Sequence, residues 1–156
     1  MINLRYPGVR PFETKERHLF FGRARDIADL YDLVLLENLL VLFGKSGYGK
    51  SSLLKAGIIP LFTEFAAESK GQFQPIEVRF GSYLAGKSLP PLQAALNTLE
   101  KEAALNKEAD FLGTLFPEKK SLWLQCKRRQ QADAGRFLMV FDQFEEFFTY
   151  PVSEQE

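Results

Sequence analysis

Apolar residues in unbroken or alternating runs predict three β-strands. The run NLLVLF at 38–43 is continuous and is followed at once by a glycine-rich stretch. Such a run is typical of a strand buried in a parallel sheet. PIEVRF at 75–80 alternates apolar with charged residues, and FLMVF at 137–141 is again continuous and ends at Asp142. Both predict further strands.

Apolar residues spaced three and four positions apart predict helices between these strands. They lie at 23–36, at 50–57, at 90–107, and in one or two pieces within 111–131. Gly57 and Pro60 are expected to end the second helix. Since strands alternate with helices, the expected fold class is α/β, a parallel sheet flanked by helices. Residues 1–22 contain several prolines and glycines and are expected to form an irregular lead-in.

Composition narrows the functional classes. The chain has 156 residues, the length of one domain, and its 20 basic and 20 acidic side chains cancel. Without a net positive charge, nucleic-acid binding is not expected. The single cysteine excludes an internal disulfide or a zinc site built from thiolates, and the single histidine excludes a multi-histidine metal cluster.

Neither a membrane span nor a signal peptide is expected. The longest apolar stretch, residues 33–43, contains Glu37 and Asn38 and is too short to cross a bilayer. The first ten residues lack the apolar core of a signal peptide. The expected location is the cytoplasm.

The segment GKSGYGKS at 44–51 matches the pattern G-x-x-x-x-G-K-[ST] without a gap. Glycines let the backbone turn its N–H groups toward a common centre, and the following helix adds its positive N-terminal end. Lys50 can reach the β- and γ-phosphates of a nucleotide, and the Ser51 hydroxyl can bind Mg²⁺. An ordinary glycine-rich strand–turn–helix connection is the alternative reading.

The third predicted strand ends in an acidic residue, as a nucleotide–Mg²⁺ site requires. Asp142 would hold Mg²⁺, and its alternative role is to cap the helix that follows. Glu145 is the preferred residue for orienting the attacking water, and Glu146 is the alternative. A solvated helix face would account for both glutamates equally well.

Several motifs together resemble the N-terminal part of the novel STAND NTPases, the signal-transduction ATPases with numerous domains. They are YPGVRPF at 6–12, HLFFGR at 18–23, the phosphate loop running into SSLLKAG at 51–57, VR at 78–79 and DQFEEFF at 142–148. The first and the last are the most specific. Phe80 departs from the family, which often has proline after V-R.

The resemblance implies a P-loop NTPase fold of the AAA-related class with ATP or ADP and Mg²⁺ as cofactors. Phe21 and Arg23 would lie beside the adenine. The implied nucleotide-binding residues are then Phe21, Arg23, Gly44, Lys45, Ser46, Gly47, Tyr48, Gly49, Lys50, Ser51 and Ser52, with Ser51 and Asp142 at the metal and Lys50 and Glu145 as catalytic residues.

The resemblance also implies a domain organisation. Residues 1–22 would be the lead-in, with the adenine-side motif at its end, and residues 23–156 the N-terminal portion of the NTPase core. The family's strand order is 5-1-4-3-2, so the three predicted strands would be the first, second and third. The fourth and fifth strands, the lid and the winged helix are expected in a longer protein. Phe141, Phe144, Phe147 and Phe148 would then be partly uncovered.

The expected function is that of a nucleotide switch with slow hydrolysis in a signalling ATPase, in some relatives linked to bacterial defence. Its partners would be nucleotide, sensor or effector domains of the larger protein and, on activation, further copies of the chain. A small-molecule kinase, a transport ATPase and a non-catalytic interaction module are the alternatives.

Overall fold

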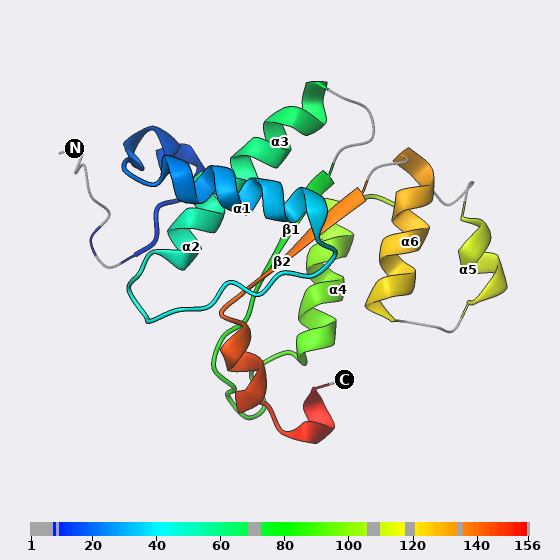
Figure 1. Ribbon diagram of the computed structural model, residues 1–156. Helices are drawn as coiled ribbons and strands as arrows, with labels where there is room; N and C mark the ends of the chain where they lie inside the picture. The colour runs from blue at the N-terminus through cyan, green and yellow to red at the C-terminus, as the bar shows by residue number, and fades with distance from the viewer. Residues whose placement is uncertain are drawn as a thin grey trace, which may run out of the picture. The chain divides into compact units, whose positions relative to one another are not determined.

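The computed structural model describes residues 8, 10–68, 73–105, 110–117, 121–133 and 136–155 (Figure 1). Tyr6, Pro7 and Val9 of the lead-in motif, and the predicted end of a helix at Lys107, lie outside the described residues. The chain forms two compact units, Met1–Phe65 and Ala66–Glu156. No helix within the described residues is long and apolar enough to cross a membrane.

The first unit is built from helices. A 3₁₀ segment, η1 (Thr14–Leu19), precedes α1 (Ala24–Leu36), which has the bounds that the apolar spacing predicted to within one residue. A second helix begins at Lys50 and runs without a break through α2 (Lys50–Ser52), the π-helical turn η2 (Leu53–Ile58) and α3 (Ile59–Glu68). The half-buried side chains of α1 face this long helix, and the Tyr31 ring stacks on Phe62 with centroids 4.9 Å apart.

The prediction that Gly57 and Pro60 end the second helix is wrong. Gly57 lies inside the helix, where a Cβ atom would come within 2.9 Å of the Ile27 side chain. The glycine therefore serves the close approach of α1. The helix passes Pro60 by widening into a π turn, in which the Ile59 N–H bonds to the Leu54 carbonyl, five residues back.

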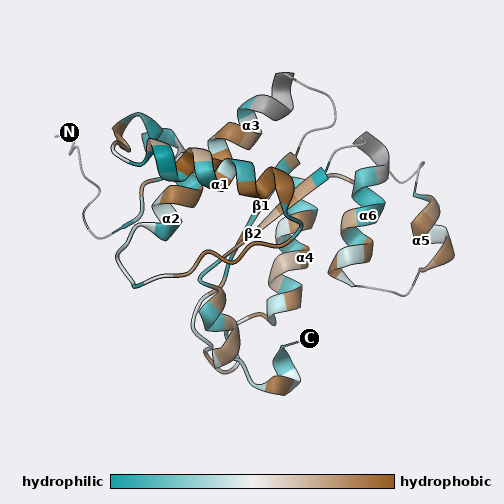
Figure 2. Ribbon diagram, in the orientation of Figure 1, coloured by the Kyte–Doolittle hydropathy of each residue, from teal (hydrophilic) through white to brown (hydrophobic). Residues whose placement is uncertain are grey.

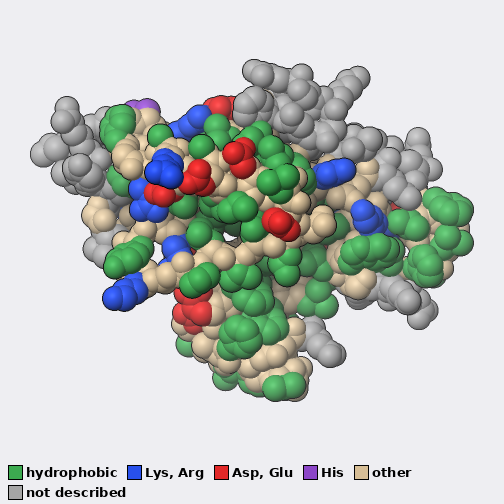
Figure 3. Space-filling model, in the orientation of Figure 1, with side chains coloured by type: hydrophobic (Ala, Val, Ile, Leu, Met, Phe, Trp, Pro, Cys, Tyr) green, Lys and Arg blue, Asp and Glu red, His purple; other side chains and the backbone are tan. Residues whose placement is uncertain are grey.

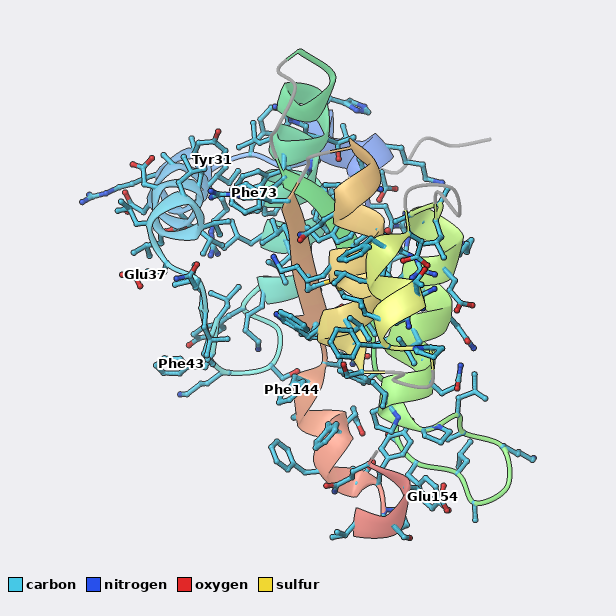
Figure 4. The ribbon with its side chains drawn as sticks, turned by 90° about the vertical axis from the view of Figure 1, so that its right-hand side faces the viewer. Tyr31, Glu37, Phe43, Phe73, Phe144 and Glu154 are labelled. Atoms are coloured by element: carbon cyan, nitrogen blue, oxygen red, sulfur yellow. The ribbon has the colours of Figure 1, made fainter. Side chains whose placement is uncertain are left out.

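The predicted strand at 38–43 is also wrong, because these residues form no strand. Their exposure nevertheless alternates as in an extended chain. Leu39, Val41 and Phe43 are 83%, 76% and 87% exposed, whereas Leu40 and Leu42 are 36% and 39% exposed. A strand exists through hydrogen bonds to a neighbouring strand, and no strand pairing is present at 38–43. The apolar segment follows α1 in Figure 2, and the Phe43 ring points outward in Figure 4.

The second unit contains the sheet, which among the described residues has two strands. Strand β1 (Phe73–Arg79) and strand β2 (Arg136–Asp142) are parallel, with Phe73 opposite Arg136 and Arg79 opposite Asp142. The resemblance places the acidic strand beside the second strand, and this pairing is confirmed.

Helices cover one face of this sheet. The helix α4 (Pro91–Glu102) packs on β1, α6 (Leu122–Asp133) packs on α4 and β2, and α5 (Phe111–Leu115) packs on α6 (Figure 1). The two predicted pieces within 111–131 are thus confirmed as α5 and α6. The core is centred on Ile76 and Leu99, and Val78, Phe80 and Ala95 extend it toward the carboxyl ends of the strands.

Short 3₁₀ segments complete the second unit after β2. They are η4 (Phe144–Thr149) and η5 (Val152–Glu154). Both are tied to the loop after β1, since the Tyr83 N–H donates to the Thr149 hydroxyl at 3.0 Å and the Tyr83 hydroxyl to the Glu154 carboxylate at 2.8 Å. The bond to Glu154 raises the pKa of Tyr83 above its ordinary value.

Candidate functional site: a glycine-rich loop and an acidic strand end

The glycine-rich loop makes a tight turn directly before the long helix of the first unit. Gly47 and Gly49 have φ angles of +83° and +77°, in the left-handed region that costs a residue with a side chain roughly 1–2 kcal/mol. Gly49 caps the helix, and its carbonyl accepts from the Leu53 N–H at 2.8 Å. The turn thereby leads the loop backbone into the helix N-terminus, a position that favours an anion.

The Lys50 side chain folds back over this loop. Its ammonium group donates to the Gly44 carbonyl at 2.9 Å and lies 3.3 Å from the Lys45 carbonyl. Both bonds are solvent-accessible, so phosphate oxygens can replace these carbonyls as acceptors. Ser51, half-buried in the first helical turn, follows directly.

The segment predicted to lie beside the adenine contacts the loop. Arg23 stands at the start of α1, forms an ion pair with Asp26, and donates from Nη1 to the Tyr48 carbonyl at 3.4 Å. Phe21 is exposed. Two segments that are distant in sequence thus meet, as a nucleotide site formed by residues 21–23 and 44–51 requires.

The lead-in is fixed to the helix that follows the loop, which the sequence did not indicate. The Phe12 N–H donates to the Ser52 hydroxyl at 3.1 Å, and the Thr14 hydroxyl donates to the Lys55 carbonyl at 3.0 Å. The buried Lys55 also forms an ion pair with Glu13 at 3.4 Å. Ser52, predicted to bind nucleotide, therefore has its hydroxyl in contact with the lead-in.

Pro60 explains the bond between Thr14 and the π turn. The Lys55 carbonyl would bond to the N–H of residue 59 in α spacing and to that of residue 60 in π spacing. The Ile59 N–H bonds to Leu54, and Pro60 has no N–H to donate. The Thr14 hydroxyl thus supplies a hydrogen bond to a carbonyl that the proline cannot serve.

The acidic strand end lies in the second unit. Asp142 is the last residue of β2, is buried, and accepts through Oδ1 from the Gln143 N–H at 3.1 Å. Gln143 has a φ of +56°, unusual for a residue with a side chain. Its Oε1 accepts from the Arg79 Nε at 2.8 Å, and the same Nε lies 3.9 Å from the Asp142 Oδ2. Sequence reasoning left the role of Arg79 open, although its place opposite Asp142 follows from strand pairing.

Glu145 and Glu146 lie in the first turn of η4, which begins after Gln143. Glu145 is exposed and Glu146 is half-buried. The Glu146 N–H bonds to the Gln143 carbonyl at 2.9 Å, so the turn at Gln143 sets the direction of this segment.

Phenylalanine rings surround this acidic strand end. Phe80 contacts Phe141 and Phe144 at centroid distances of 5.8 Å each, and Phe144 stacks on Phe147 at 5.3 Å. Phe141, Phe144 and Phe148 are exposed and Phe147 is half-buried, which confirms the expectation of a partly uncovered cluster. Figure 3 shows hydrophobic side chains gathered on the surface of this part of the chain, and Figure 4 labels Phe144 just beyond the end of β2.

The predicted site residues thus form two groups. Phe21, Arg23 and residues 44–52 belong to the first unit, where Arg23 and the loop are in contact. Asp142, Glu145 and Glu146 belong to the second unit, at the carboxyl end of the parallel strands. In α/β proteins this end of a sheet is where ligands bind.

The fold and these two groups define an α/β protein with a glycine-rich loop at a helix N-terminus and a buried aspartate at a strand end. The profile of the family described as "Novel STAND NTPase 1" matches residues 6–156. The chain belongs to this family, as the motifs indicated. A comparison with curated proteins gives no significant match, and neither does a comparison with solved structures.

Proposed function

We propose that this chain binds ATP and ADP with Mg²⁺ through a P-loop NTPase fold and serves as the nucleotide switch of a STAND signalling protein. The observation that supports this most is the contact between Arg23 and the carbonyl of Tyr48. It joins the base-side segment to the loop in which the Lys50 ammonium lies over the backbone. Membership of an NTPase family supports the same function.

A titration of the purified chain with a fluorescent adenine nucleotide tests this proposal. Unlabelled ATP and ADP are expected to displace the probe, and chelation of Mg²⁺ is expected to weaken the binding of ATP, because the metal would neutralise charge on its phosphates. GTP is expected to compete less well than ATP. A chain that is folded by circular dichroism and shows no saturable binding of the probe would contradict the proposal.

Ser51 and Asp142 are the residues that would hold Mg²⁺. Hydroxyl and carboxylate oxygens are ligands that this hard cation prefers, and its nucleotide sites generally combine one or two such groups with phosphates and water. When bound, the metal would neutralise charge on the phosphates. Lys50 would bind the terminal phosphates, and the loop N–H groups would hold the remaining phosphate oxygens.

Glu145 is proposed to orient the water that attacks the terminal phosphate. Replacing Glu145 with glutamine is expected to lower single-turnover phosphate release at least about tenfold, because a glutamine cannot accept the proton. Nucleotide affinity is expected to stay within about threefold, since the side chain acts on water. Glu146→Gln is the matched control, and a loss of phosphate release in that variant alone would transfer the role to Glu146.

The proposed switch acts within a larger protein. STAND NTPases are multidomain proteins, so sensor and effector domains are the proposed partners, together with further copies of the chain on activation. Residues 23–156 would supply the phosphate loop and the strands second and third in the family's order. The adjacent parallel pairing of β1 and β2 agrees with this assignment. The proposed location is the cytoplasm.

A further inference from the structure

Arg79 and Asp142 end two neighbouring strands at the same level. Because β1 and β2 are parallel and pair these residues directly, both side chains leave the sheet at its carboxyl edge. The pairing continues one step further, where the Phe80 N–H bonds to the Asp142 carbonyl at 3.0 Å. The backbone therefore holds the guanidinium group and the carboxylate next to each other.

A nearby positive charge favours the buried carboxylate of Asp142. Its side chain is only 8% exposed, and removal of a carboxylate from water is costly unless a cation compensates it. The Arg79 Nε, 3.9 Å from Oδ2, supplies that charge from a side chain that is itself 49% exposed. A divalent cation bound at Asp142 would supply the same compensation.

Gln143 holds the guanidinium more closely than the carboxylate does. The bond from Arg79 Nε to Gln143 Oε1 is 2.8 Å long, against 3.9 Å to the Asp142 Oδ2. The guanidinium can thus move away from the carboxylate while Gln143, in its left-handed conformation, still accepts from it. Such an arrangement suits a cation that leaves the carboxylate when another cation arrives.

We propose that Arg79 is a positioning residue that serves as the counter-cation of Asp142 and competes with the divalent metal for this carboxylate. The inference rests on the proposed function, because it takes Asp142 as a metal ligand. Arg79 would hold the buried carboxylate in place before the metal–nucleotide complex binds, and it would set the metal concentration at which that complex forms.

The affinity for Mn²⁺, used as a spectroscopic substitute for Mg²⁺, tests the competition. Free Mn²⁺ is measured by electron paramagnetic resonance during a titration of the chain in the presence of ADP. Arg79→Gln is expected to lower the half-saturating Mn²⁺ concentration about three- to fivefold, the effect of removing one half-exposed charge beside the carboxylate. Arg79→Lys, which keeps the charge, is expected to resemble the wild type.

Arg136→Gln is the matched control, because it removes the same charge from the opposite end of the same strand pair. It is expected to leave the Mn²⁺ affinity within about twofold. In chains that also carry Asp142→Asn, the Arg79→Gln substitution is expected to leave the Mn²⁺ affinity unchanged, because the carboxylate for which the two cations compete is gone. Each variant is first compared with the wild type by thermal unfolding, so that only folded chains are titrated.

The sign of the change decides between two roles of Arg79. A merely structural arginine would leave Asp142 less well placed when removed, so the required Mn²⁺ concentration would rise or stay the same, and this result would overturn the inference. If the wild type binds ADP and Mn²⁺ but Arg79→Gln binds the metal no more tightly, the inference alone fails. If the wild type binds neither, the proposed function fails with it.

Discussion

Replacing Lys50 with alanine is expected to weaken the binding of Mg-ATP about a hundredfold, equivalent to about 3 kcal/mol. The ammonium group lies over the glycine-rich loop and bonds to the Gly44 carbonyl at 2.9 Å. Bonds between charged groups and phosphate oxygens contribute roughly 1.5–3 kcal/mol each, and the methyl group of alanine makes none. Isothermal titration calorimetry with ATP and with ADP measures the loss.

Lys45→Ala is the matched control for this experiment. Lys45 is an exposed lysine in the same loop, and its backbone carbonyl accepts from the Lys50 ammonium group. Truncating its side chain removes the same charge and leaves that carbonyl, so the affinity is expected to change less than about fivefold. Equal losses of affinity in the two variants would mean that the loop attracts nucleotide only by its positive charge. If Lys50→Ala binds nucleotide as tightly as the wild type, the phosphate-loop assignment is refuted.

Replacing Leu99 with alanine is expected to lower the free energy of unfolding of the second unit by about 3 kcal/mol. The side chain is 0% exposed and lies on α4, packed in one cluster with Ile76 of β1. The substitution leaves a cavity between the helix and the sheet, and both the transfer energy and the lost packing contribute to the cost. Urea unfolding followed by far-ultraviolet circular dichroism measures it.

Leu89→Ala provides the comparison for the core variant. Leu89 is 54% exposed in the loop before α4, so the same deletion of side-chain atoms is expected to cost less than about 0.5 kcal/mol. Similar losses at the two positions would show that α4 does not cover the sheet as described. A large loss at Leu99 alone would show that α4 stabilises the sheet through its packing on β1.

The spacing of apolar residues correctly predicted the strands and helices that pack against other strands and helices of the chain. The strand 75–80 appeared as β1 because its alternating apolar residues Ile76 and Val78 meet the face of α4. The strand ending at Asp142 appeared beside it, in the order that the resemblance implied. In both strands the apolar face packs against a neighbouring element, and its burial determines the register of the strand pairing.

The spacing of apolar residues gave wrong predictions where contacts with another segment determine the local structure. The apolar run 38–43 has the composition of a strand, yet strand structure depends on backbone pairing that residue types alone do not supply. Pro60 was expected to break a helix, but the π turn accommodates it and Thr14 supplies a donor from another segment. A rule based on single residues has no means of including such a tertiary contact.

Some residues of the candidate site could likewise be predicted from the sequence, and others could not. Residues 44–51 were predicted as a phosphate loop because that loop requires a fixed spacing in the sequence, and Asp142 was predicted as a metal ligand because it ends an apolar strand. The contact of Arg23 with Tyr48 agrees with what the family resemblance implied. Arg79 was not assigned a role, because the role proposed for it follows from its position opposite Asp142 and from the left-handed turn at Gln143. Strand register, read together with the residue types at strand ends, is the signal that would have found it.

The widened turn at Leu53–Ile58 lets the residue at position 60 influence one of the contacts that attach the lead-in. Any amino acid other than proline at position 60 would bring an N–H that could reach the Lys55 carbonyl at π spacing. That donor would share the Lys55 carbonyl with the Thr14 hydroxyl, because a carbonyl oxygen has two lone pairs. The missing N–H of Pro60 therefore leaves the Thr14 hydroxyl, from a segment more than forty residues earlier in the chain, as a donor to this carbonyl.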